Sequence, residues 1–297
     1  MYQHVATNCP CCNGVNISRS PAILSPFMAK KIFNWDVIKI NDSWGLRDID
    51  NGTAYPLCSS LQCQDCTFLF LDIRFTNDEL SNYYSDYQSE EFFSMREEYE
   101  PSFASRRQNF VPGSGDISDV FSHMDVVEKF LSNYITKTDK ILDWGGKDGL
   151  NTPFKDSCLL HHVVDFNSNN YSNGLGIDLS DAKNNNYDLI VFRHILEHCS
   201  YPFLLLEHAR SFLTESSIIY VEVPYESIVR KNPNNKSLHK KKKLWHEHIN
   251  FFNPQSIEAL IQHSGFKILG TKQFRIPNAS VGDDEGRYHL MYAFSRK

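Results

Sequence analysis

After residue 118, the hydrophobic and polar positions alternate between a helical period and short apolar runs. Across residues 119–134 the apolar positions recur every three or four residues, which predicts an amphipathic helix. Further helices are predicted at 203–213 and 254–264, and Gly265 suits the end of the second. The apolar runs predict strands at 140–144, 160–166, 175–179, 187–192, 218–223, 267–274 and 288–294. Strands alternating with helices indicate an α/β domain with a mostly parallel sheet covered on both faces.

A break in this pattern separates the N-terminal third of the chain. Residues 111–118, VPGSGDIS, gather Gly, Pro and Ser, as loops do. Before them lie paired cysteines, short extended runs and a polar aromatic stretch. The chain has 297 residues, 41% of them hydrophobic, which suffices for about two ordinary domains. We expect an N-terminal domain at 1–110, a linker at 111–118 and a second domain at 119–297.

Composition narrows the range of partners. The chain carries 30 basic and 36 acidic residues, a formal net charge of −6, which disfavours nucleic acid as a partner. No run approaches the roughly 20 apolar residues that cross a bilayer, and the N-terminal residues lack the features of a signal peptide. We expect a cytoplasmic protein without membrane attachment. Its eight cysteines are then metal ligands or buried thiols rather than disulfides.

A glycine-rich turn follows the first predicted strand of the second domain. The segment ILDWGGKDG ends its apolar run at Asp143 and then carries Gly145, Gly146 and Gly149. Glycines allow positive φ and a close approach of the backbone to a ligand. The segment lacks both the Gly-Lys-Ser/Thr of a phosphate-binding loop and the Gly-x-Gly-x-x-Gly of dinucleotide folds. The acid before the glycines favours a cationic or hydroxyl-bearing ligand, although a tight corner without a ligand would use the same residues.

Two more acids follow predicted strands. Asp165 comes about twenty residues after the turn, where an acid can reach ribose hydroxyls at the carboxyl edge of a sheet. Asp178 follows another short apolar run and could accept a hydrogen bond from an adenine amino group. Each acid alone could equally be a helix cap or a turn residue. Three acids in this order at strand ends favour a ligand site at that edge.

These motifs resemble those of the class I S-adenosylmethionine-dependent methyltransferases. DWGGKDG resembles their first motif, YDLIVFRHILEH their fourth-strand motif, and HEHINFFNPQSIEALIQHSGF the late segment of many small-molecule members. The resemblance implies a doubly wound seven-stranded sheet with a final antiparallel strand, and S-adenosylmethionine bound over residues 145–149. It implies that Asp143 lies near the amino-acid part of the cofactor, Asp165 at the ribose, and Asp178 with Leu179 at the adenine. The other residues assigned to cofactor binding are Gly145, Gly146, Asp148, Gly149, Phe166, Arg193 and His194.

Two Cys-x-x-Cys pairs occur in the expected N-terminal domain, Cys9 with Cys12 and Cys63 with Cys66. Four such thiolates form tetrahedral structural zinc sites. The gap of about fifty residues between the pairs is longer than in a short zinc finger, so buried free thiols are the alternative. Cys11 is the alternative ligand to Cys12.

A second resemblance involves the same cysteines. Together with Tyr-Pro-Leu at 55–57 and Tyr-Tyr at 83–84, the pairs look like the N-terminal zinc domain of sugar C-methyltransferases, which act on nucleotide-linked deoxysugars. The resemblance implies a structural zinc ion and a catalytic Tyr-His-Glu-His motif, matched here by His246, Glu247 and His248. Trp245 stands in the place of the tyrosine and offers no phenolic group for acid–base chemistry.

Histidine is the natural base for removing an acceptor proton near neutral pH. His246 and His248 are two residues apart and would face one side of a strand, with Glu247 facing the other. We favour His248 as the base, as the motif implies, although either histidine could be structural. The lysine run 240–243 is either a solvated loop or a basic element that meets a diphosphate or closes as a lid.

The sequence thus predicts a zinc-containing, two-domain methyltransferase that uses S-adenosylmethionine and acts on a small molecule. O-methylation of a sugar or sugar nucleotide is the favoured activity, and C-methylation of a nucleotide keto-sugar is second. The competing classes are an RNA or protein methyltransferase whose zinc module grips its substrate, and a cofactor-binding protein without catalysis.

Overall fold

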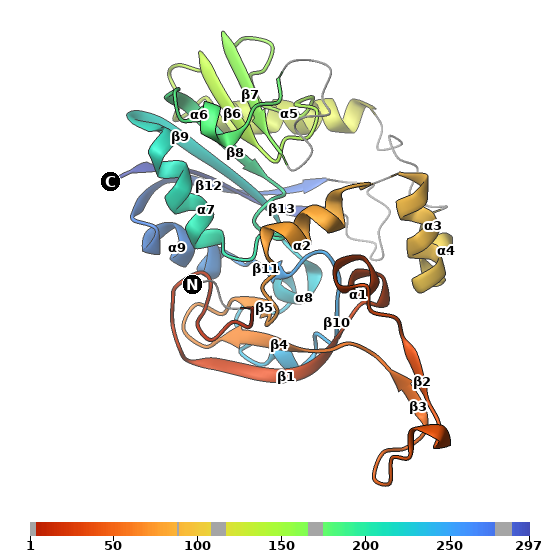
Figure 1. Cartoon of the computed structure of the whole chain (residues 1–297). Helices are drawn as coiled ribbons and strands as arrows, with labels where there is room; N and C mark the ends of the chain where they lie inside the picture. The colour runs from red at the N-terminus through yellow and green to blue at the C-terminus, as the bar shows by residue number, and fades with distance from the viewer. Residues whose placement is uncertain (1–3, 88, 108–116, 166–174, 277–286) are drawn as a thin grey trace.

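The computed structural model of the chain describes residues 4–87, 89–107, 117–165, 175–276 and 287–297 (Figure 1). Its larger sheet has six strands in the order β12-β13-β9-β8-β6-β7. They are β6 (Lys140–Trp144), β7 (Leu160–Val164), β8 (Tyr187–Arg193), β9 (Leu213–Pro224), β12 (Phe266–Ile276) and β13 (Arg287–Arg296). Neighbours among β6 to β9 pair in parallel, and β13 is antiparallel to both β9 and β12. The sheet is therefore mixed.

Seven strands are expected for this sheet, and the described residues form six. Where the sequence predicts a strand at 175–179, only Gly176 pairs, in a single parallel bridge to Val163 of β7. Helix α6 (Leu179–Ala182) follows, with Asp178 as its N-cap residue. The apolar run is too short to form a ladder because the chain turns into this helix at the aspartate.

Two apolar clusters lie on opposite faces of the larger sheet, because successive strand residues point to opposite sides. Leu189 and Val191 of β8 pack with Leu131 of α5 (Ile117–Leu131). Ile190 and Phe192 belong to the other cluster, which includes apolar residues of α7 (Pro202–Ala209) and α9 (Pro254–His263). Figure 1 shows α7 and α9 close together on their side of the sheet. The sheet is thus covered on both faces, as its apolar strands require.

A second sheet combines strands from distant parts of the chain. Its order is β10-β1-β4-β5-β11, with β1 (Ile17–Leu24), β4 (Leu57–Cys63), β5 (Leu69–Leu71), β10 (Leu244–Trp245) and β11 (Asn250–Phe251). β10 pairs in parallel with β1, and β11 pairs antiparallel to β5. The two expected domains, 1–110 and 119–297, therefore share this sheet. Most of the expected linker, 111–118, lies outside the described residues.

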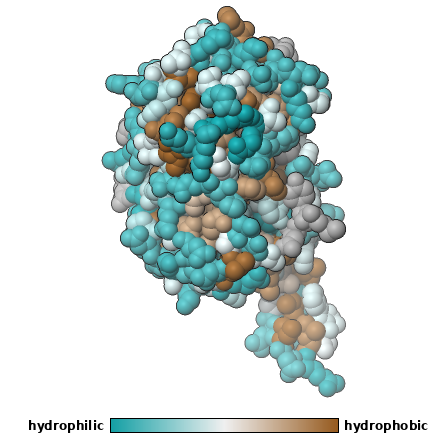
Figure 2. All heavy atoms as spheres, turned by 90° about the vertical axis from the view of Figure 1, so that its left-hand side faces the viewer, coloured by the Kyte–Doolittle hydropathy of each residue, from teal (hydrophilic) through white to brown (hydrophobic). Residues whose placement is uncertain are grey.

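Short helices and a projecting hairpin complete the N-terminal part. The helices are α1 (Pro26–Phe33), α2 (Asn77–Tyr84), α3 (Glu90–Tyr99) and α4 (Ser102–Arg107), and α8 (Ser227–Arg230) follows β9. The hairpin of β2 (Ile38–Ile40) and β3 (Gly52–Ala54) extends away from the body as an arm (Figures 1 and 2). Large apolar side chains are exposed along it: Trp35, Ile38, Trp44, Leu46 and Ile49. Among the described helices, none has the length and apolar character to span a membrane.

A buried guanidinium joins the second sheet to the turn that follows β8. Arg74 donates hydrogen bonds to the carbonyl of Ser200 (3.0 Å) and to Oδ1 of Asn250 (2.9 Å). Asn250 in turn donates to the carbonyl of Cys199 at 2.6 Å. Burial lowers the pKa of Arg74 to about 10, which leaves it charged at neutral pH. This network fixes the chain around β11 against the turn after β8.

Candidate active site

The glycine turn after β6 has no room for side chains at its glycine positions. Gly145 and Gly149 have φ values of +81° and +72°. A Cβ on Gly145 would overlap the side chain of Ile195, and one on Gly146 would overlap the carboxylate of Asp143. The turn therefore requires glycine for two reasons, its backbone conformation and its close neighbours.

Two of the predicted acids lie against this turn. Asp143 is only 4% exposed, and it accepts a hydrogen bond from the hydroxyl of Thr152. Burial raises the pKa of Asp143 to about 6 despite that hydrogen bond. Asp165, directly after β7, accepts a hydrogen bond from the backbone N–H of Lys147 at 3.1 Å. Both carboxylates thus belong to the carboxyl edge of the parallel strands, where α/β sheets bind ligands.

The other residues predicted to bind the cofactor occupy varied positions. Asp178 precedes α6 but its side chain makes no capping hydrogen bond, so this carboxylate is not used to start the helix. Asp148 accepts a hydrogen bond from the N–H of Leu150 at 3.1 Å. Leu179 begins α6, and Phe166 lies outside the described residues. Acceptor oxygens beside a glycine turn suit a ligand rich in hydroxyl and amino donors, which fits the nucleoside and amino-acid parts of S-adenosylmethionine.

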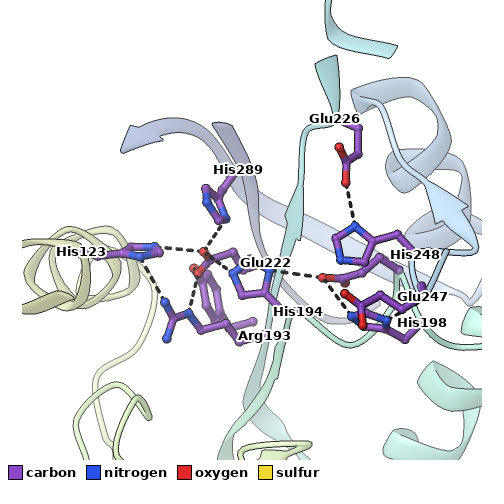
Figure 3. Close-up of polar contacts among 11 residues, drawn as sticks. His123, Arg193, His194, His198, Glu222, Glu226, Glu247, His248 and His289 are labelled. Carbon is purple, nitrogen blue, oxygen red and sulfur yellow. Dashed lines mark hydrogen bonds and ion pairs between the residues drawn. The ribbon is translucent and has the colours of Figure 1, made fainter. Parts of the chain in front are cut away.

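Glu222 of β9 is fully buried and lies among three histidines and an arginine (Figure 3). Its Oε1 is 2.9 Å from Nε2 of His123, 3.0 Å from Nδ1 of His289 and 3.3 Å from Nε2 of His194. Its Oε2 accepts a hydrogen bond from Nε of Arg193 at 3.2 Å. Burial favours the neutral acid, but the arginine and the histidines hold the pKa of Glu222 well below its usual range. The carboxylate is therefore ionised.

A second polar cluster lies beside the first and contains His248 (Figure 3). Nδ1 of His248 is 2.7 Å from Oε1 of Glu226. The rings of His198 and His248 contact edge to face, with centroids 4.8 Å apart. Glu197 joins the two clusters, because its Oε1 lies 3.2 Å from Nδ1 of His194 and 3.9 Å from Nε2 of His198. Burial opposes the charged form of His248, but the hydrogen bond to Glu226 and the nearby carboxylates raise its pKa above the ordinary value.

The segment that contains His246 and His248 is not a strand. β10 ends one residue before it, and the chain bends, so the expected placement of both histidines on one side of a strand is wrong. Nδ1 of His246 lies 3.6 Å from Oε1 of Glu100, near the end of α3. Glu247 accepts a hydrogen bond from the hydroxyl of Tyr83 at 3.0 Å. The three residues of the motif thus contact three different partners.

Trp245 and part of the lysine run 240–243 pack against the rest of the protein. Trp245 is fully buried, and its indole N–H donates to the hydroxyl of Ser60 at 2.7 Å. The ammonium of Lys242 lies over the same indole, 5.0 Å from the ring centroid, and burial lowers its pKa to about 8. The other lysines of the run, at 240, 241 and 243, are exposed. Of these exposed lysines, Lys243 donates a hydrogen bond to the carbonyl of Pro21 at 3.4 Å.

The two predicted cysteine pairs converge. The Sγ atoms of Cys9, Cys12, Cys63 and Cys66 all lie within 4.8 Å of one another. The Sγ–Sγ distance is 3.5 Å between Cys9 and Cys66, and 3.6 Å between Cys12 and Cys63. Cys11 is buried and does not belong to this group.

A family model described as a methyltransferase domain matches residues 118–270, just over half of the chain. The chain belongs to this methyltransferase family. It is a methyltransferase. The match covers the glycine turn, both polar clusters except His289, and the strands that carry them.

Solved structures similar to this methyltransferase share little sequence with it. A methyltransferase from Leishmania major has 15% identity and a TM-score of 0.42, with 62% of this chain and 74% of that chain covered. The 1,6-didemethyltoxoflavin-N1-methyltransferase of Burkholderia thailandensis has 14% identity and a TM-score of 0.41, with 66% and 90% covered. No curated protein matches the chain.

The motifs of the methyltransferase do not point to Glu222, His123, His289 or Glu226. One signal for Glu222 is present in the sequence, because an acid inside the apolar run 218–223 must find partners when that run is buried. His123 and His289 carry no comparable signal. They come from α5 and β13, and only the fold brings them to the same carboxylate.

The contacts at Gly145 predict a specific loss of stability. Gly145→Ala should lower the free energy of unfolding by about 1–3 kcal/mol more than Gly45→Ala, because the new methyl group must displace Ile195. Gly45 is a matched control, since its φ is also positive (+65°) but nothing lies within 4 Å of its Cβ position. Denaturant unfolding of both variants measures the difference. Equal losses would show that only the backbone conformation matters at Gly145.

Proposed function

We propose that this methyltransferase methylates an oxygen of a sugar or nucleotide-linked sugar, and that His248 removes the proton of the acceptor hydroxyl. The observation that carries the proposal is the 2.7 Å contact between Nδ1 of His248 and the carboxylate of Glu226. A carboxylate on one ring nitrogen fixes the tautomer and orientation of a histidine, which leaves the other nitrogen to accept a proton. The side chain of His248 is 31% exposed, so a ligand can reach it.

The position of this pair supports a role next to the methyl donor. Glu226 follows the end of β9, and His198 follows β8, which is the parallel neighbour of both β6 and β9. The glycine turn follows β6. The histidine pair and the turn therefore occupy the same edge of the sheet, as an acceptor base and a donor site require.

S-adenosylmethionine, when bound, supplies a methyl group on a positively charged sulfur. The chain contributes binding and orientation. In this proposal Asp165 accepts hydrogen bonds from the ribose hydroxyls, Asp178 with Leu179 meets the adenine, and Asp143 lies near the amino-acid part. The turn at 145–149 lets the backbone approach the ligand closely.

One observation favours O-methylation over C-methylation. Trp245 occupies the position of the tyrosine in the resembling motif, and its indole is buried with its N–H on Ser60. It offers no acid–base group for carbon chemistry. For either kind of methylation, the exposed lysines at 240 and 241 precede the histidine motif, and in this proposal they meet the diphosphate of a nucleotide sugar.

We also propose that Cys9, Cys12, Cys63 and Cys66 hold a structural zinc ion. Four sulfurs at a Zn–S distance of about 2.3 Å in a tetrahedron lie about 3.8 Å apart. The Sγ–Sγ distances of 3.5 and 3.6 Å in the structure fit that spacing, as does the two-pair pattern.

The cofactor assignment predicts a loss of affinity at Asp165. Asp165→Asn should weaken S-adenosylmethionine binding by about 1–3 kcal/mol, because the ribose hydroxyls lose a charged acceptor. The asparagine keeps an oxygen for the N–H of Lys147, so the turn is preserved. Calorimetric titration measures the change, with Asp156→Asn at an exposed loop position as control. Unchanged affinity in Asp165→Asn would remove this residue from the site.

The zinc assignment predicts that metal content and stability fall together. Purified without chelator, the protein should contain zinc at the cysteine group, and Cys63→Ser should lower both zinc content and melting temperature. Cys58→Ser is the matched control, because Cys58 is a buried thiol of the same strand, β4, outside the group. Elemental analysis and thermal unfolding of both variants decide the matter. Equal zinc content in the two variants would contradict the proposal.

The base assignment predicts a rate effect and a pH effect. With an acceptor found by labelled methyl transfer to a panel of nucleotide sugars, His248→Ala should lower kcat by about 10²–10⁴-fold with little change in cofactor affinity. His248 must be neutral to act, and its pKa is raised, so activity should fall as the pH drops through a value above 6.5. Glu226→Gln removes the charge that raises this pKa and should move the acid limb to lower pH.

A control variant separates this effect from a general loss of structure. His208→Ala changes a half-buried histidine of α7 that packs against Trp144, far along the chain from the motif, and should keep the wild-type pH profile. An unmoved acid limb in Glu226→Gln, or near-full turnover in folded His248→Ala, would refute His248 as the base.

A further inference from the structure

We propose that His194, Glu222 and His289 form a binding site for a divalent transition-metal ion such as Zn²⁺, separate from the cysteine group. The three side chains come from adjacent elements of the larger sheet: His194 follows β8, Glu222 lies in β9 and His289 lies in β13. One nitrogen of each histidine and one oxygen of Glu222 lie within 4.8 Å of one another. Two nitrogens and one carboxylate oxygen form the donor set of many three-ligand metal centres.

The polar atoms that face this centre lack other partners. Oε1 of Glu222 and both ring nitrogens of His289 form no hydrogen bond of acceptable geometry with any described residue. Yet Nδ1 of His289 and Nε2 of His194 lie only 3.0 and 3.3 Å from that oxygen. Buried polar groups rarely remain unsatisfied. Their lone pairs converge without satisfying one another, which is the arrangement expected around a shared cation.

The surrounding residues hold each ligand in a suitable orientation. Oε1 of Glu197 lies 3.2 Å from Nδ1 of His194, so that nitrogen donates its proton to Glu197 and Nε2 faces the centre as a ligand. Oε2 of Glu222 accepts hydrogen bonds from Arg193 and from the hydroxyl of Tyr220, which leaves Oε1 for the centre. Carboxylates behind metal-bound histidines commonly play this part.

His123 also approaches Glu222, but it presents a protonated nitrogen and not a lone pair. Its Nδ1 lies 3.1 Å from a guanidinium nitrogen of Arg193, which can only donate, so Nδ1 accepts and Nε2 carries the proton. That proton faces Oε1 of Glu222 at a nitrogen–oxygen distance of 2.9 Å. This nitrogen also forms no hydrogen bond of acceptable geometry, but because it carries a proton it is not a ligand, and the site has three ligands.

The site is closed on the side of β13 and open on the side of His194. Glu222 and His289 are buried, whereas the His194 side chain is 33% exposed. A bound ion would keep coordination positions on the exposed side for water or an oxygen ligand, as catalytic metal sites do. Glu197, His198 and His248 form the competing group, but there the closest nitrogen–oxygen contact, His198 to Glu197, is 3.9 Å.

The test uses the full chain without a polyhistidine tag, with zinc bound at the cysteine group and loose metal removed by desalting. Titration with Co²⁺ is followed by calorimetry and visible absorption. We expect one Co²⁺ per chain beyond the zinc, with ligand-field bands but no thiolate charge-transfer band. A wild-type protein that takes up no such Co²⁺ overturns the proposal without any variant.

Substitutions then locate the ion. His289→Gln and His194→Gln should each weaken Co²⁺ binding by roughly 100-fold or more, since even residues behind the ligands are worth 10–100-fold. His162→Gln is the control, because this half-buried strand histidine hydrogen-bonds Tyr187 and lies outside the cluster; it should bind Co²⁺ as wild type does. Zinc content and circular dichroism verify that each variant is folded.

The outcomes at the competing group are equally decisive. Loss of Co²⁺ binding in His198→Gln, with binding retained in His289→Gln, would assign the ion to Glu197, His198 and His248 and overturn the proposal. Retained binding in His198→Gln supports it. The weakly buried His194 provides a variant that can be judged even where His289→Gln fails to fold.

Discussion

The contact between Arg74 and Asn250 determines how the two sheets meet. A fully buried guanidinium needs hydrogen-bond acceptors, and here the carbonyl of Ser200 and the amide oxygen of Asn250 both accept from Nη1 of Arg74. Asn250 also binds the carbonyl of Cys199. The turn after β8 and the segment before β11 are thereby held together. Each carries one histidine of the His198–His248 pair, so the geometry of that pair depends on a charge that lies outside it.

A buried charge also organises the cluster around Glu222, at the carboxyl edge of the larger sheet. Glu222 lies near the end of β9, after an apolar run, and is ionised, so it requires cationic or donating neighbours from several elements. Arg193 comes from β8, His123 from α5 and His289 from β13. These polar contacts add to the apolar packing of the sheet. The contact from His289 limits how β13 can shift against β9. Glu197 lies close to histidines of both this network and the His248 cluster. A change of charge in one cluster therefore alters the electrostatic energy of the other.

Local features of the chain could be read from the sequence, and contacts between distant segments could not. β6 has the predicted bounds, 140–144, because the short apolar run there is bounded by polar residues, which mark where the strand begins and ends. The two cysteine pairs are recognisable because each spacing is local. β10 and β11 have two residues each, too few to show any period, and their pairing with β1 and β5 depends on the fold. The same limit applies to Glu222: its need for partners is visible, but their identity requires the register of β9 against β13.

The shared sheet has a consequence for how the chain is made. β1, β4 and β5 are synthesised early, but their outer neighbours β10 and β11 lie at residues 244–251. On the ribosome, the N-terminal sheet therefore exposes two unpaired edges until most of the chain has emerged. Such edges pair readily with other chains, and long-range pairing is slow. Nascent copies of this protein are thus most exposed to aggregation, and to chaperone capture, during the interval before residue 251 leaves the exit tunnel.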